Sequence, residues 1–189
     1  MYELKIIIAS TRPGRKGPSV ASWIVEKAKD YKEFNVELLN LAVINLPMMD
    51  EPEHPRLKKY QHEHTKKWSN IINGADAFIF VTAEYNYGYP APLKNAIDYL
   101  SKEWAYKPLG FVSYGGIAAG TRALQSLRGV VSAVKLIAID PAVNIPFFAH
   151  HIDEHGIFKP NDSLNHSSDN LFQELLKWAP VLKEMRGNR

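Results

Sequence analysis

Short apolar runs alternate along the chain with segments in which apolar residues recur at helical spacing. The runs are predicted strands, and they lie at about Leu4–Ala9, Val36–Leu41, Ala77–Thr82, Leu109–Ser113 and Lys135–Ile139. The first and third runs are apolar at nearly every position, which is typical of parallel strands covered on both faces. This alternation predicts an α/β fold, with a doubly wound five-stranded parallel sheet and helices on both faces.

Helical spacing predicts the connections between these strands. The expected helices begin near Pro18, span His54–Asn73, begin near Pro90, run from about Ala118 to Ala133, and cover Ser167–Lys183. Pro180 is expected to kink or end the last helix. Residues 141–166 show prolines, histidines and no clear period, so they are expected to form an irregular excursion. Without a repeat or linker, residues 1–189 are expected to form one domain.

Composition narrows the possible classes of protein. The chain has 189 residues, 46% of them hydrophobic, and a net charge of +3. Because this excess is small and dispersed, no nucleic-acid partner is expected. No apolar run approaches the length of a membrane span, so no membrane association is expected. The absence of cysteine excludes thiolate chemistry and disulfides, and is compatible with a cytoplasmic location.

The loop after the first strand combines hydroxyls, glycines and cations, and Pro18 suits the first position of the helix that follows. Free N–H groups and the positive dipole end at a helix start favour an anion. The loop is therefore a predicted phosphate cradle. Its candidate residues are Ser10, Thr11, Arg12, Arg15, Lys16, Pro18, Ser19 and Val20.

Two further loops follow the third and fourth strands. Carboxyl ends of neighbouring parallel strands open on one crevice, so these loops are expected to meet the phosphate cradle. One loop carries three tyrosines as flat walls for a ring, and the other carries glycines that let backbone N–H groups approach a ring edge. The candidates are Glu84, Tyr85, Asn86, Tyr87, Ser113, Tyr114, Gly115 and Gly116. Together the three loops predict one ligand with an anionic end and a flat polar ring.

These motifs carry a family resemblance. The segments 10–15, 84–86, 93–95 with Pro90, and 113–116 resemble those of the NAD(P)H-dependent FMN reductase family of flavodoxin-like proteins. The resemblance implies the strand order 2-1-3-4-5, non-covalently bound FMN, and a homodimer or homotetramer.

The resemblance also implies roles for individual residues. It implies phosphate contacts from Ser10, Arg12 and Ser19. It implies contacts with the ribityl chain and ring from Tyr85, Asn86 and Tyr87, and with the pyrimidine edge from Gly115 and Gly116. Many relatives have serine and asparagine where this chain has Arg15 and Gly17. The replacement phosphate contact is therefore Arg15, Lys16 or Ser19.

The implied activity is ping-pong hydride transfer. NADPH or NADH reduces flavin N5, and a small acceptor (quinone, azo compound, free flavin or oxidised metal) then takes the electrons. No side chain is assigned as catalytic, because the flavin performs the redox step and stacked rings chiefly need proximity. The alternatives are a flavodoxin-type electron carrier and a redox-sensing flavoprotein without NAD(P)H turnover.

Other site classes fit the sequence poorly. The first loop lacks G-x-G-x-x-G, and the chain contains no G-x-x-x-x-G-K-[ST], so neither a dinucleotide-binding dehydrogenase nor a P-loop protein is expected. The histidines cluster in His62–His64 and His150–His155. Residues one or two apart do not share a helix face, and adjacent residues seldom bind one ion, so no metal site is expected.

Overall fold

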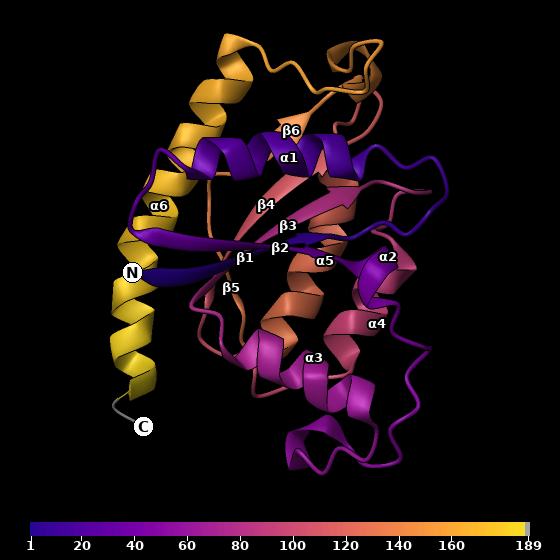
Figure 1. The fold of residues 1–189 in the computed structure, drawn as a ribbon, viewed down its shortest axis with the longest axis vertical. Coiled ribbons are helices and arrows are strands. Elements are labelled where there is room, and N and C mark those ends of the chain that lie inside the picture. Colours follow the sequence, from indigo (N-terminus) through magenta and orange to yellow (C-terminus); the bar gives the residue numbers. More distant parts are fainter. Residues whose placement is uncertain (188–189) are drawn as a thin grey trace.

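The computed structural model describes residues 1–187; residues 188 and 189, which the predicted domain includes, lie outside the described part. Five parallel strands lie in the order β2-β1-β3-β4-β5, and a further strand, β6, pairs with β4 (Figure 1). The strands are β1 Tyr2–Ile8, β2 Phe34–Asn40, β3 Ala77–Ala83, β4 Pro108–Tyr114, β5 Ile137–Ala138 and β6 Val143–Ile145. The expected order and parallel pairing are confirmed, but the sheet has six strands rather than five.

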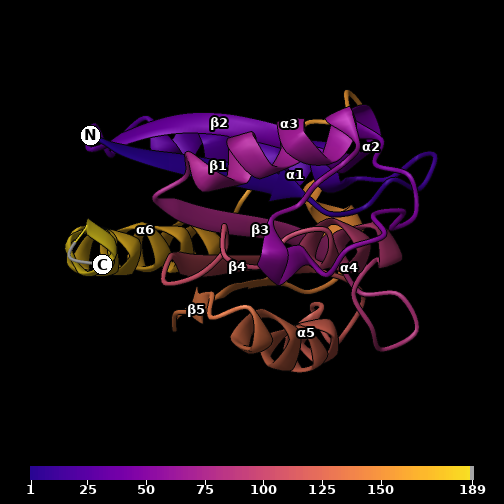
Figure 2. The ribbon, with the colours of Figure 1, turned by 90° about the horizontal axis from the view of Figure 1, so that it is seen from below.

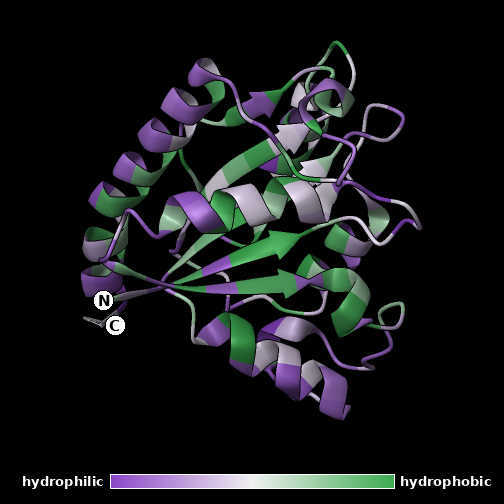
Figure 3. Ribbon diagram, turned by 45° about the horizontal axis from the view of Figure 1, so that its top comes forward, coloured by the Kyte–Doolittle hydropathy of each residue, from purple (hydrophilic) through white to green (hydrophobic). Residues whose placement is uncertain are grey.

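Two helical layers cover the sheet. Helices α1 and α6 pack on one face, and α3, α4 and α5 pack on the other (Figure 2). The helices are α1 Gly17–Ala28, α2 Leu41–Ile44, α3 Glu63–Asn73, α4 Ala91–Asp98, α5 Thr121–Ala133 and α6 Asp162–Gly187. All seven residues of β3 and of β4 are buried, and Figure 3 shows these apolar strands between helices with hydrophilic outer positions. Within residues 1–187, no helix is long and apolar enough to cross a bilayer.

The strand ends are level at the carboxyl edge. Ile8 of β1 pairs with Val81 of β3, and Thr82 pairs with Ser113 of β4. The loops that follow these three strands therefore leave the sheet side by side, as the sequence analysis predicts for the ligand crevice.

The predicted helix over His54–Asn73 is wrong in its first half. Only a short 3₁₀ turn forms at Pro55–Leu57, and α3 begins at Glu63. Lys58 has a left-handed backbone with φ of 55°, which interrupts a right-handed helix. The Glu51 carboxylate then accepts the N–H groups of Gln61 and His62, so a loop contact replaces helical hydrogen bonds just before α3.

The last two helices also differ from the prediction. Helix α5 begins at Thr121, three residues later than expected, whereas α6 begins at Asp162, five residues earlier. Asn161 caps the start of α6 by accepting the Leu164 N–H at 2.9 Å. Pro180 does not end the helix, which continues to Gly187. Leu182 is buried in these final turns.

The predicted fifth strand is shorter than expected, and residues 141–166 are less irregular. β5 pairs with the first residues of β4, and β6 pairs with Val112–Tyr114 at its other end. Two short strands thus cover one edge of β4, with the cis Asp140–Pro141 bond between them. Because β6 runs toward the carboxyl edge, it delivers the following residues, including Phe148, to the ligand crevice.

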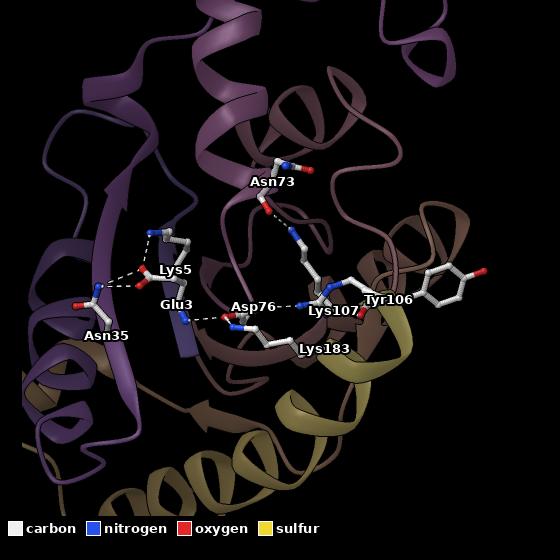
Figure 4. A network of polar contacts seen from close by, with 9 residues as sticks. Glu3, Lys5, Asn35, Asn73, Asp76, Tyr106, Lys107 and Lys183 are labelled. Atoms are coloured by element: carbon white, nitrogen blue, oxygen red, sulfur yellow. Dashed lines mark hydrogen bonds and ion pairs between the residues drawn. The ribbon is translucent and has the colours of Figure 1, made fainter. Parts of the chain in front are cut away.

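A polar network ties α6 to the opposite, amino edge of the sheet (Figure 4). The buried Asp76 carboxylate accepts the Glu3 N–H at 3.1 Å, Lys183 Nζ at 2.7 Å and an Arg186 nitrogen at 2.9 Å. These contacts join β1, the start of β3 and the last turns of α6, which is consistent with the continuation of α6 beyond its proline.

Lys107 is a buried cation in the same region. It is 3% exposed, and its Nζ donates to the carbonyls of Ile72 and Asn73 at 2.7 and 3.0 Å. Those carbonyls belong to the last turn of α3, where no intrahelical donor remains. Burial, with the positive charge of Arg186, lowers the pKa of Lys107 to about 7.

This pKa predicts a pH-dependent stability. Between about pH 7 and pH 10 the unfolded chain protonates this lysine and the native state does not, so the free energy of unfolding rises with pH. The slope from one such group is at most about 1.4 kcal/mol per pH unit. In Lys107→Met that contribution is absent, so urea unfolding at pH 6.5 to 9.5 will give a flatter profile than the wild type. The exposed Lys32→Met is the control, and parallel wild-type and Lys107→Met profiles would contradict the assignment.

Candidate functional site

The loops after β1, β3 and β4 enclose one cleft at the carboxyl edge of the sheet. Its volume is about 250 Å³. The lining residues come from all three loops and from the segment after β6; they are Arg12, Gly14, Arg15, Lys16, Ala83, Glu84, Tyr85, Tyr114, Gly115, Gly116 and Phe148. The structure thus brings together eight of the sixteen predicted site residues: Arg12, Arg15, Lys16, Glu84, Tyr85, Tyr114, Gly115 and Gly116.

Tyr114 reaches from the end of β4 to the start of α1. A Cβ atom on Gly17 would lie 2.8 Å from its hydroxyl oxygen, so the contact requires glycine at the first residue of the helix. The Tyr114 side chain is buried, and this burial raises the pKa of its hydroxyl, which therefore remains a hydrogen-bond donor at neutral pH.

Two buried donors at this point have no acceptor. Within the described part of the chain, neither the Tyr114 hydroxyl nor Nε of Arg15 has a hydrogen-bond partner. Helix α1 also begins without a side-chain cap. Buried polar groups are normally paired, and a helix start favours negative charge, so this end of the cleft fits an anion. The exposed cations of Arg12 and Lys16 also line the cleft.

The second loop forms a tight hairpin beside this anion position. The N–H groups of Tyr85 and Gly88 each donate to the other residue's carbonyl, at 2.8 and 2.9 Å. Asn86 and Tyr87 occupy the two turn positions with φ of 49° and 68°, as a type I′ turn requires. The hairpin therefore has a defined shape without any ligand.

Polar contacts fix the hairpin to both neighbouring loops. The Tyr85 hydroxyl lies 2.8 Å from Oγ of the fully buried Ser10 in the first loop. On the other side, the Glu84 carboxylate accepts the backbone N–H of Arg122 at 3.2 Å and its Nε at 2.6 Å. The Arg122 guanidinium also lies 3.9 Å from the centre of the Tyr87 ring. The walls of the cleft are thus held together from α5 to β1.

The third loop presents an open glycine edge. The Gly115 N–H donates to the Ile145 carbonyl at 3.2 Å, so β6 already uses one of the two N–H groups expected at a ring edge. The Gly116 N–H makes no hydrogen bond with any described residue. A Cβ atom on Gly116 would meet nothing within 4 Å, so this residue borders open space.

Several predicted site residues lie outside the cleft. Pro18 and Ser19 line a separate cavity beside Trp23 and Phe158, and the Ser19 hydroxyl donates to the Gly156 carbonyl at 2.7 Å. Of the three alternatives for the extra phosphate contact, Arg15 and Lys16 thus border the cleft and Ser19 does not.

The remaining predicted residues have structural positions around the cleft. Val20 is fully buried in the core beneath α1, and Thr11 lines an adjoining cavity of about 340 Å³. Ser113 is also fully buried, with its Oγ 2.7 Å from the Ala119 carbonyl and 2.8 Å from Oδ1 of Asn144. Asn86 and Tyr87 are exposed at the hairpin tip.

Sequence reasoning missed two residues that shape the site. Phe148 belongs to the segment without a period, and its place became visible only through the pairing of β6 with β4. Its ring packs edge-on against Tyr114 at 5.2 Å between centroids. Arg122 was visible at the start of a predicted helix, but its partner Glu84 lies 38 residues away, and no local pattern indicates that pairing.

A family model described as NADPH-dependent FMN reductase matches residues 3–150. The chain belongs to this family. An NAD(P)H-dependent FMN reductase of Schizosaccharomyces pombe is 43% identical over 148 residues, which cover 76% of this chain and 74% of that protein. An NADPH azoreductase of Bacillus sp. is 27% identical over 187 residues, or 97% of each chain. These matches confirm the resemblance drawn from the motifs, and with it an FMN-dependent NAD(P)H oxidoreductase.

Solved structures share the fold. FerB, a flavoenzyme NAD(P)H:(acceptor) oxidoreductase from Paracoccus denitrificans, has a TM-score of 0.77 at 19% identity, and the match covers 96% of this chain and 98% of that one. An oxidoreductase from Corynebacterium diphtheriae has a TM-score of 0.73 at 16% identity, over 97% and 98% of the two chains. The expected flavodoxin-like fold is confirmed.

The open edge at Gly116 yields a direct test of the cleft. In Gly116→Leu the new side chain will project into the open space beside the third loop, where the sequence predicts the ring edge of the flavin. Overpacking of this kind costs about 1–3 kcal/mol, so the Kd for FMN will rise by roughly tenfold or more. Fluorescence titration with FMN measures this change, and a melting curve will show little loss of stability. Gly129→Leu, on an open face of α5, is the matched control. Equal FMN affinity in both variants would contradict the placement.

Proposed function

We propose that Arg15 and the Tyr114 hydroxyl would hold the phosphate of FMN in this cleft, and that the cofactor would supply the chemistry of electron transfer from NADPH or NADH to a small acceptor. The observation that carries the proposal is the pair of buried donors without acceptors at the start of α1. A phosphate there would accept from both groups and would lie at the positive end of the helix dipole.

The other cleft residues have distinct tasks in this proposal. Arg12 and Lys16 add positive charge at the exposed side of the phosphate, where charge-assisted hydrogen bonds are worth about 1.5–3 kcal/mol. Tyr85 and the hairpin form a wall for the ribityl chain and ring, and the free Gly116 N–H lies at the ring edge. The cleft encloses about 250 Å³, so part of the ring would remain accessible to a second molecule.

In this proposal the protein contributes to turnover by leaving one face of the flavin ring accessible to the two substrates. Bound FMN supplies the hydride and electron transfer chemistry, and the protein holds it so that a nicotinamide and then an acceptor can stack on the same exposed face. We assign no acid or base among the side chains. The names of relatives include an azoreductase and NADPH:quinone oxidoreductases, which support azo compounds and quinones as acceptor classes.

We further propose that the protein forms a homodimer or homotetramer, as a single 1–189 domain in each subunit, in the cytoplasm. Large apolar side chains stand exposed in the segments that follow β2 and β4, among them Val43 at 78%, Met48 at 77% and Ile117 at 80%. Exposed apolar groups gathered near one region favour a protein contact. The lack of cysteine supports a reducing compartment.

Anaerobic reduction tests the activity. The purified protein, saturated with FMN, is expected to lose its flavin absorbance at about 450 nm on addition of NADPH or NADH and to regain it when a benzoquinone is added. Initial rates at several acceptor concentrations should give the parallel reciprocal plots of a ping-pong mechanism. A flavin that binds but stays oxidised under excess NADPH and NADH would instead identify an electron carrier or redox sensor.

A further inference from the structure

A second concave site lies at the amino edge of the sheet, away from the flavin cleft. Its volume is about 550 Å³, and its charged lining residues are Arg56, Lys102, Lys135 and Arg186. Among residues 1–187, no carboxylate lines this basic cavity. Within residues 1–187, the side chains of Arg56, Lys102 and Lys135 form no ion pair. Three cations therefore line the same cavity, and no described residue supplies a compensating charge there.

Two carboxylates that act on Lys107, those of Asp76 and Glu103, are buried and already accept hydrogen bonds. Asp76 accepts from Lys183 and from the Glu3 N–H, as Figure 4 shows. It also accepts from Arg186. Glu103 is 1% exposed and accepts from the hydroxyls of Tyr60 and Ser69 at 2.9 and 2.7 Å. Neither carboxylate is free to turn toward the cations of the cavity. The exposed cations Arg56, Lys102 and Lys135 thus keep a positive charge that neither of these carboxylates offsets by an ion pair.

The cavity also has an apolar part. The residues that form this apolar part are Tyr106, Ala133 and Val134, and Ser101 adds a hydroxyl to the lining. Ligand sites typically measure about 300–1,000 Å³ and combine apolar walls with a few polar groups, and this cavity meets both criteria. A flat, uncharged moiety fits against the apolar wall while an anionic group meets the cations.

We propose that the basic cavity binds a phosphorylated small molecule, with nucleoside phosphates as the best-fitting class. The site is separate from the flavin cleft, because the seven residues of β4 place about 20 Å between Lys107, just before the strand, and Tyr114 at its end. The flavin phosphate cannot serve both sites.

Calorimetric titration of the FMN-saturated protein tests this proposal with three probes: ADP, inorganic pyrophosphate and adenosine. ADP is expected to bind more tightly than pyrophosphate, because it adds contacts with the apolar wall, and adenosine is expected to bind least. The double variant Arg56→Ala/Lys102→Ala should weaken ADP binding by about tenfold or more, since it removes two charge-assisted contacts. Both side chains are exposed, so the fold and the flavin spectrum should be unchanged.

The double variant Lys32→Ala/Lys67→Ala is the matched control, because it removes the same charge from exposed positions outside the cavity. If ADP affinity falls equally in both double variants, the loss comes from the lower net charge of the protein and not from the cavity, and the proposal is overturned. It would also be overturned if ADP does not bind, if pyrophosphate binds as tightly as ADP, or if the cavity variant leaves ADP affinity unchanged. The last result would place ADP at the flavin cleft.

Discussion

The close packing of the Tyr114 hydroxyl against Gly17 is the constraint on which the site depends. It joins the end of β4 to the first residue of α1, and leaves a buried donor at a helix start. The level carboxyl ends of β1, β3 and β4 make this contact possible, because they bring the three loops to one edge. The links from Ser10 to Tyr85 and from Glu84 to Arg122 then hold the loops in place before any ligand arrives. Such preorganisation lowers the cost of ordering the site on binding.

The two edges of the sheet differ in how their polar groups are paired. At the carboxyl edge, unpaired donors and a glycine border form an open cleft. At the amino edge, Asp76 collects two cations of α6, and Lys107 binds the final carbonyls of α3. This second arrangement anchors helices, but it also uses the local carboxylates and leaves the neighbouring cations of the basic cavity without partners. The ion pairs that anchor α6 thus leave the nearby exposed cations available to bind an anionic ligand.

Much of the fold and of the cleft could be predicted from local patterns. Continuous apolar runs identify β1, β3 and β4, and the polar loops after them hold most of the cleft's lining residues. The failures have a common cause, which is contact between distant segments. The 54–62 segment leaves the helical path where Glu51 captures two N–H groups, and the three-residue β6 exists through its pairing with β4. Ser19 has a hydroxyl that could contact a phosphate, but in the structure this hydroxyl donates to the carbonyl of the distant Gly156.

The most direct measurement is a crystal structure of the protein with FMN bound. We expect phosphate oxygens within about 3 Å of the Tyr114 hydroxyl and of Nε of Arg15, with the ring edge at the Gly116 N–H. A phosphate placed instead beside Ser19 and Trp23, or a Tyr114 hydroxyl that remains without an acceptor in the complex, would contradict it.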